Sequence, residues 1–296
     1  MAYRKSGTRA ARRPTRRTNR RRYSAKKNYS RPTKKMIRRV TSRRRLLNIT
    51  SQKKRDNMMP VITDWKGEAP ISGPATLNGS GRTTMIWCAT QRDRATPPYV
   101  DNPESARTSK SIFLRGLREF SILRTSSPDA WRWRRIVFTV KGLGAYMPAD
   151  ARFSVETNVQ GWSRALTDFS GVASTPARNA MEALIFAGDA GKDWASVFTA
   201  KVDRTRVTPL LDKTRILRTG NQQGSYFKNK MWLPVNKSLV YADEESGNNM
   251  LEASLSTLGR PGIGDIYVVD LFDCSTGNSA STLLFEPEAT LYWHER

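Results

Sequence analysis

The sequence predicts an all-β protein: a β-sandwich preceded by a disordered, basic N-terminal arm. Beyond about residue 58, short stretches of β-branched and aromatic residues alternate with clusters of Gly, Pro, Asn and Ser, which is typical of strands joined by loops. The first 55 residues contain 23 Lys and Arg, no Asp or Glu, and almost no aliphatic residues before Met36. Such a segment cannot offset its ordering entropy by burial, so we expect it to be disordered alone.

Eight segments have the composition of strands, and this number suggests a sandwich. They are residues 83–90, 111–123, 131–140, 202–211, 214–218, 226–241, 264–274 and 282–294. In the second of them, Ile112, Leu114, Phe120 and Ile122 share one parity, which predicts that they form its buried face.

Two prolines interrupt predicted strands. Pro234 and Pro287 cannot donate a hydrogen bond to a neighbouring strand, so we expect both strands to lie at an edge or to contain a bend. One helix is predicted over residues 177–187, where Met181, Leu184 and Ile185 have helical spacing. A second short helix is predicted over residues 193–199, with Asp193 at its N-terminus. The expected organisation is an arm, residues 1–55, and one folded domain, residues 56–296.

The positive charge of the chain is concentrated in the arm. Of 51 Lys and Arg, 23 lie in residues 1–55, which leaves 28 against all 26 Asp and Glu. This asymmetry predicts a polyanionic partner, and nucleic acid above all. We expect phosphate contacts from a set of arm residues: Arg12, Arg13, Arg16, Arg17, Arg20, Arg21, Arg22, Lys26, Lys27, Arg31, Lys34 and Lys35.

Short basic runs at the end of the arm are typical of nuclear localisation signals, which a host import receptor binds. They consist of Arg38, Arg39, Arg43, Arg44 and Arg45. A mitochondrial transit peptide has a similar composition but needs an apolar helical face. Pro14, Pro32 and the shortage of Leu and Ile argue against such a face.

The run from Trp131 to Phe138 alternates aromatic and cationic side chains along a predicted strand. One interpretation is a secondary DNA contact through Arg132 and Arg134. The alternative is that Trp131 and Trp133 pack in the core while the arginines pair with acidic neighbours, and the general burial of Trp favours it.

The sequence offers little for catalysis or cofactor binding. His294 is the only histidine, and Cys88 and Cys274 lack the spacing of a metal or redox pair. We therefore expect no enzyme activity, no cofactor and no metal site. The acidic run 243–245 is left open between a cation site, a contact with arginines of a neighbouring subunit and a solvated loop. No apolar run is long enough to span a membrane, so no membrane association is expected.

Several features together resemble the capsid proteins of genomoviruses, small viruses with circular single-stranded DNA, and more distantly those of geminiviruses. They are the basic arm, the run Trp131-Arg-Trp-Arg-Arg-Ile-Val-Phe138, the stretches 203–207 and 212–214, and Tyr241-Ala-Asp-Glu-Glu-Ser-Gly247. The resemblance implies an eight-stranded jelly roll and a T=1 icosahedral shell of sixty subunits. It also implies that the arm packages the viral single-stranded DNA inside the virion, after assembly in the host nucleus. The alternative is a cellular nucleic-acid-binding protein of ribosomal or chromatin type with a basic tail.

Overall fold

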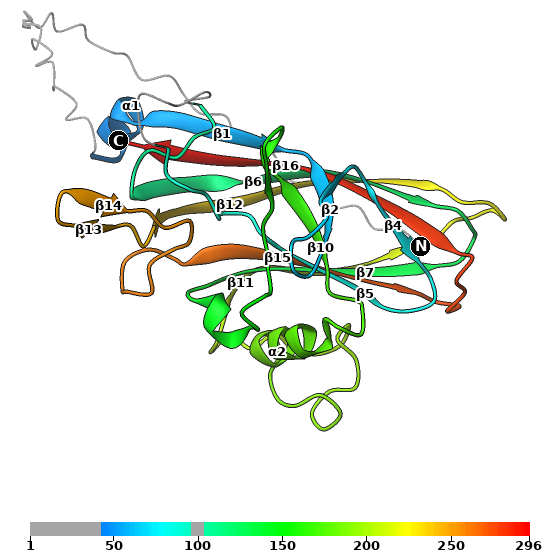
Figure 1. Ribbon diagram of the computed structural model, residues 1–296. Helices are drawn as coiled ribbons and strands as arrows, with labels where there is room; N and C mark the ends of the chain where they lie inside the picture. The colour runs from blue at the N-terminus through cyan, green and yellow to red at the C-terminus, as the bar shows by residue number, and fades with distance from the viewer. Residues whose placement is uncertain (1–42, 96–103) are drawn as a thin grey trace, which may run out of the picture. The chain divides into compact units, whose positions relative to one another are not determined.

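Two stacked β-sheets form the folded part of the chain (Figure 1), in a computed structural model that describes residues 43–95 and 104–296. The first sheet has the strand order β1 (Gln52–Met58), β16 (Thr282–Glu295), β6 (Ser111–Thr125), β12 (Tyr226–Val240), with β4 (Ala75–Asn78) also paired to β16. The second sheet has the order β11 (Thr208–Leu217), β7 (Trp131–Val140), β15 (Asp265–Cys274), β5 (Thr83–Cys88), β10 (Arg164–Asp168), β2 (Pro60–Asp64), β3 (Ile71–Ser72).

The strand order is that of a jelly roll. Eight principal strands are, in chain order, β1, β5, β6, β7, β11, β12, β15 and β16. Numbered one to eight, they lie in the order 1-8-3-6 in the first sheet and 5-4-7-2 in the second. Successive strands therefore cross between the sheets at every step except that from the fourth to the fifth, β7 to β11, which pair in the second sheet. This is the arrangement of the two interlocked Greek keys that define this sandwich. The predicted all-β, eight-stranded jelly roll is confirmed, and β10, β2 and β3 extend its second sheet.

The remaining elements are short. They are the strands β8 (Glu156–Thr157), β9 (Gly161–Trp162), β13 (Glu244–Ser246) and β14 (Asn249–Leu251), the 3-10 helix η1 (Leu143–Tyr146), and the helices α1 (Arg43–Thr50) and α2 (Thr175–Ile185). No helix among residues 43–95 and 104–296 is long and apolar enough to cross a membrane.

Helix α2 covers the outer face of the second sheet (Figure 1). Its residues Met181, Leu184 and Ile185 pack in one core cluster with side chains of β7 and β15. The predicted helix over residues 177–187 is thus confirmed, whereas the one over residues 193–199 is wrong. The carboxylate of Asp193 accepts the Asp189 N–H (2.7 Å) and closes a turn, so it does not begin a helix.

Most predicted strands correspond to observed ones, with two exceptions. Residues 202–211 and 214–218 are not two strands, because β11 runs continuously from Thr208 to Leu217 and the segment before it forms a turn. The strands that were not predicted are β1, β2, β3, β4, β8, β9, β10, β13 and β14. They are short, and β1 is mostly polar in sequence.

The predicted buried face of β6 is right for its first half and wrong for its second. Ile112 and Leu114 are buried, but beyond Gly116 the inward residues are of the opposite parity and include Glu119 and Ser121. The reason is a β-bulge: the pairing of β6 shifts register beside Gly116 against both neighbours. A shift of one residue turns every later side chain to the other face.

Both prolines lie where no backbone donor is needed. Pro234 lies on β12, an edge strand, at the start of the register shift. Pro287 lies within β16, but β1 pairs only with residues 289–295 of that strand and β4 only with residues 282–285. Pro287 therefore faces a gap between two partners. The expectation of an edge is confirmed for β12, whereas β16 lies inside the sheet and is unpaired on one side only at this gap.

The arm ends earlier than predicted. Residues 52–58 form β1 and pair with Glu295–Ala289, and Lys54 is 3% exposed with its ammonium 2.9 Å from the Glu295 carboxylate. The boundary at residue 55 is thus wrong, because Lys54 and Arg55 belong to the fold. Residues 1–42 contain 17 of the 51 basic residues and no acidic ones, which leaves 34 against 26, or a net charge of +8, in residues 43–296.

Candidate nucleic-acid interface

The predicted arm contacts fall largely outside the residues that the structure describes. This holds for the twelve residues from Arg12 to Lys35 and for Arg38 and Arg39. Arg43, Arg44 and Arg45 form the first turn of α1, which leads directly into β1. Contacts of these residues with DNA or an import receptor stay predictions.

The run from Trp131 to Phe138 forms β7, with the alternation that the sequence indicates. Trp131 and Trp133 point into the sandwich and are buried. Arg132 and Arg134 lie on the opposite face and pair with carboxylates: Arg132 with Asp273 at 2.7 Å, and Arg134 with Asp212 at 2.7 Å. The geometry matches the alternative in which the arginines bind acidic neighbours.

The two arginines differ in how open they are to a ligand. Arg134 has a side chain only 5% exposed and donates to the carbonyls of Val197 and Ala200 as well as to Asp212. It holds residues 197–200 against β7, which leaves no face for a phosphate. The Arg132 side chain is 42% exposed and its guanidinium stacks 3.9 Å from the centre of the Phe198 ring. A DNA contact through Arg132 stays a prediction.

Between the two sheets lies a closed cluster of four charges, named here the interior charge cluster. Glu119 comes from β6 in the first sheet, and Arg135, Arg164 and Asp270 come from the second. Arg135 pairs with both carboxylates, and Arg164 pairs with Glu119 at 3.0 Å and with Asp270 at 2.7 Å. Every side chain in the cluster is at most 4% exposed.

Neighbouring groups complete the interior charge cluster. Trp133 Nε1 donates to Asp270 (2.8 Å), and the Ser121 hydroxyl donates to Glu119 (2.8 Å). Burial by itself would raise the pKa of Asp270, but Arg135 and Arg164 outweigh it and leave this pKa below its usual value. The two guanidinium groups thus each pair with both carboxylates. The cluster is a structural link between the sheets, with its charges already paired.

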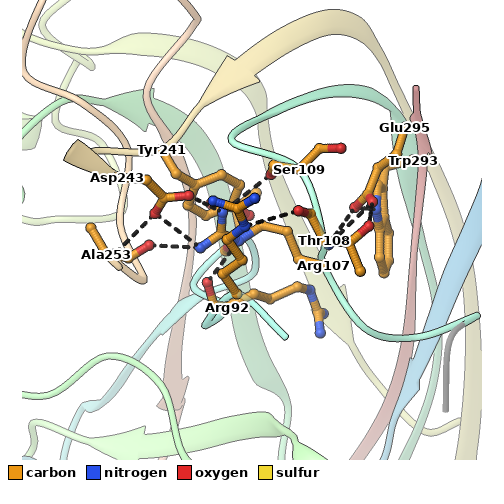
Figure 2. Close-up of polar contacts among 11 residues, drawn as sticks. Arg92, Arg107, Thr108, Ser109, Tyr241, Asp243, Ala253, Trp293 and Glu295 are labelled. Carbon is orange, nitrogen blue, oxygen red and sulfur yellow. Dashed lines mark hydrogen bonds and ion pairs between the residues drawn. The ribbon is translucent and has the colours of Figure 1, made fainter. Parts of the chain in front are cut away.

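A second polar cluster anchors loops at one end of the sandwich (Figure 2). The Arg107 guanidinium binds Asp243 at 2.8 and 3.3 Å, donates to the Ala253 carbonyl (2.9 Å), and lies 3.8 Å from the centre of the Tyr241 ring. Asp243 is fully buried and also accepts the Ala253 N–H (2.9 Å).

This arrangement bears on the acidic run 243–245. Asp243 is committed to Arg107 of the same chain, whereas Glu244 and Glu245 are exposed on the β13–β14 hairpin. Within residues 43–95 and 104–296, no group of three His, Cys, Asp or Glu side chains is placed to hold a metal ion. Asp243 is therefore a loop anchor.

Glu295 ties three segments together beside that cluster (Figure 2). It binds the Lys54 ammonium from β1 and accepts the Thr108 hydroxyl (2.6 Å) and Trp293 Nε1 (2.7 Å). The two cysteines take no part in these networks; both are buried free thiols. Burial raises the pKa of Cys88 to about 12, which makes its thiol a weak nucleophile at neutral pH.

One surface with the properties of a nucleic-acid interface was missed in the sequence. It is the solvent face of the first sheet, where basic and aromatic side chains gather. Its signal was present in β12, where Tyr226, Lys228, Lys230 and Trp232 recur at every second position. The part on β6 was hidden by the bulge at Gly116, which exchanges the two faces of that strand.

Comparison with known proteins adds weak likenesses only. No protein-family model and no curated protein sequence matches the chain. Among solved structures it is similar to VP1 of Trichodysplasia spinulosa-associated polyomavirus, with 8% identity, a TM-score of 0.14, and coverage of 83% of this chain and 94% of VP1. It is also similar to VP1 of Washington University polyomavirus, with 10% identity, a TM-score of 0.15 and the same coverage. The jelly-roll fold follows from the strand order of the chain itself.

The interior charge cluster leads to a prediction about stability. The change Glu119→Gln leaves two buried guanidinium groups with one carboxylate, so we expect the free energy of unfolding to fall by about 3–5 kcal/mol. Urea denaturation of the full chain measures it. The matched control is Asp273→Asn, which removes the partner of Arg132, a half-exposed arginine of the same strand, and should cost less than about 1 kcal/mol. Equal losses in the two variants would contradict the role of the cluster.

Proposed function

We propose that this chain is a viral capsid protein that assembles into a closed shell and packages single-stranded DNA. The observation that carries the proposal is the joining of a jelly-roll body to a segment, residues 1–42, with 17 basic and no acidic residues. Jelly rolls occur in capsid proteins, but also in lectins and cupins, so the fold alone does not decide the function. The segment of uniform charge adds a polyanionic partner.

The sequence resemblance to genomovirus capsid proteins supports a more specific form of the proposal. In that form sixty copies build a T=1 shell, and the arms lie inside against a circular genome. Sixty segments with 17 cations each carry about 1,000 positive charges, enough to pair with on the order of a thousand phosphates. The role is structural, with no catalytic step.

The proposed packaging mechanism is charge neutralisation without sequence recognition. Pairing of Lys and Arg with phosphates positions the nucleic acid but carries no information on base sequence. Subunits whose arms share one DNA strand are held at high local concentration, which favours contacts between their folded bodies. Assembly and packaging are thereby coupled.

The rival function is that of a cellular nucleic-acid-binding protein with a basic tail. The net charge of +8 in residues 43–296 fits this rival as well. The two functions differ in self-assembly, since a ribosomal or chromatin protein does not close into particles of one size.

Particle formation is the first expected outcome. Full-length protein mixed with single-stranded DNA should form uniform, closed, small particles by negative-stain electron microscopy, because the arms concentrate the subunits. Protein that stays dispersed, or forms only irregular aggregates with DNA, would argue for the cellular alternative.

The second expected outcome concerns salt. For single strands the log-log dependence of affinity on salt has a slope of about −0.7 per phosphate neutralised, so replacing Arg12, Arg13, Arg16 and Arg17 by Ser should flatten it by up to about 3. Two unrelated oligonucleotides of equal length should bind alike. A hundredfold preference for one of them would show that recognition depends on base sequence.

The third expected outcome concerns import into the nucleus, where we propose that assembly takes place. Residues 1–50 fused to a fluorescent reporter should accumulate in nuclei. Replacing Arg38, Arg39, Arg43, Arg44 and Arg45 by Ala should reduce the nuclear signal, because the import receptor binds basic runs. A cytoplasmic signal from the unchanged fusion would contradict the proposed signal.

A further inference from the structure

We propose that the solvent face of the first sheet, named here the basic face, is a second binding surface for single-stranded DNA. This inference rests on the proposed function, in which the arm holds the same DNA. The difference is that the basic face belongs to the folded body and presents its groups in a fixed arrangement.

The basic face carries most of the excess charge of the folded part. Its cations are Lys53 and Arg55 on β1, Arg115, Arg118 and Arg124 on β6, and Lys228 and Lys230 on β12. Its acidic residues are Glu286 and Glu288 on β16. The face thus contributes +5 of the net +8 in residues 43–296.

These seven cations are not neutralised by the protein. Within the residues that the structure describes, none of them forms a salt bridge with a carboxylate. Arg115 donates to the Asn236 side chain (2.7 Å) and Arg124 to the Tyr226 hydroxyl (3.2 Å), and the charge of Glu286 acts on Arg124 without forming a salt bridge. This contrasts with the arginines of the second sheet described above, which are paired. Uncompensated cations on one face suit a polyanion.

Aromatic rings lie among these cations. Trp232 is 52% exposed, and its ring meets that of Tyr292 from β16 edge to face, with centroids 5.7 Å apart. The indole lies across Gly116 of β6, where a Cβ would come within 2.7 Å of it. Gly116 therefore makes room for a ring that lies over the sheet and is open to solvent. Exposed rings beside cations are what proteins use to stack unpaired bases.

The order of groups along β12 fits an extended strand of nucleic acid. Tyr226, Lys228, Lys230 and Trp232 point the same way at every second position, so two rings flank two ammonium groups over about 20 Å. Tyr226 is 65% exposed. Bases could stack on the two rings while the backbone between them contacts the lysines.

The positive charge of the basic face acts on the pKa of His294, the sole histidine of the sequence. His294 lies on β16 beside Phe113 of β6, and its pKa is lowered, first by burial and then by the charges of Arg115 and Lys53. The positive charges of Arg115 and Lys53 thus disfavour the protonated imidazole.

Geometry and charge favour DNA over a second copy of the chain. Two basic faces brought together would repel each other. The arm continues through α1 into β1, an edge strand of this same sheet, so DNA held by the arm is tethered close to the face and binds it at high effective concentration. An acidic protein partner would meet the same cations but would not need exposed rings.

The test uses full-length variants and a matched control. The face variant replaces Arg118, Lys228 and Lys230 by Ser; the control replaces Lys201, Arg204 and Arg260, which are exposed elsewhere, by Ser. Affinity for a thirty-residue oligo-dT is measured against salt. We expect the slope to flatten by up to about 2 in the face variant and to stay unchanged in the control, relative to the unchanged protein.

Photo-crosslinking locates the DNA independently. An oligonucleotide with 5-iodouracil should crosslink to peptides that contain Trp232 or Tyr292, as well as to the arm. Trp232→Ala should remove the crosslink to the peptide that contains position 232 and leave the crosslink to the arm. Crosslinks confined to the arm, with equal slopes in the face and control variants, would overturn this inference and leave the proposed function standing. Absence of any crosslink would overturn both. If the face variant bound DNA with the affinity of the unchanged protein, the occupant of the basic face would instead be an acidic protein.

Discussion

A single β-bulge determines which side chains of β6 face the interior and which face solvent. Beside Gly116 the strand shifts by one residue against both neighbours, so Glu119 and Ser121 turn inward while Arg118, Phe120 and Arg124 turn outward. Without that shift the strand would place Arg118 between the sheets and Glu119 in water. The interior charge cluster would then hold three cations and one anion, an arrangement with a large desolvation cost. The bulge is therefore required both by the core and by the basic face.

The interior charge cluster explains how the two sheets keep one alignment relative to each other. Four ionised groups in a dry interior are costly unless every partner is in place, so a displaced pairing of the sheets leaves buried charge unpaired. Apolar contacts such as those around Leu117 and Val137 tolerate small shifts, because dispersion is not directional. Charge pairs and the hydrogen bond from Trp133 do not tolerate such shifts, and we infer that they select the observed alignment of the two sheets.

The sequence predicts the strands well and their faces less well. Strands such as β7 and β15 are rich in β-branched and aromatic residues, and their position follows from composition. The position of β1 does not follow from composition, because its sequence Gln-Lys-Lys-Arg-Asp-Asn-Met resembles the arm. Only its pairing with β16 and the contact of Lys54 with Glu295 make it part of the fold. Likewise the run at Trp131 suggested a DNA contact, but its arginines have partners from distant segments that sequence spacing does not reveal. The basic face was missed for the same kind of reason, since it is formed by four strands and depends on a bulge.

The two outer faces of the sandwich differ in coverage and in charge, and this difference bears on assembly. The outer face of the second sheet is partly covered by α2 (Figure 1), whereas the outer face of the first sheet is basic, and α1 leads along the chain into β1 of that first sheet. A shell needs subunits with one side toward the genome. If the chain forms the proposed shell, the positive charge of the basic face and the tether of the arm both place the first sheet inward, and the layer that contains α2 then lies outward. The polarity of the subunit would thus follow from the charge distribution of one jelly roll, without any contact that reads the DNA sequence.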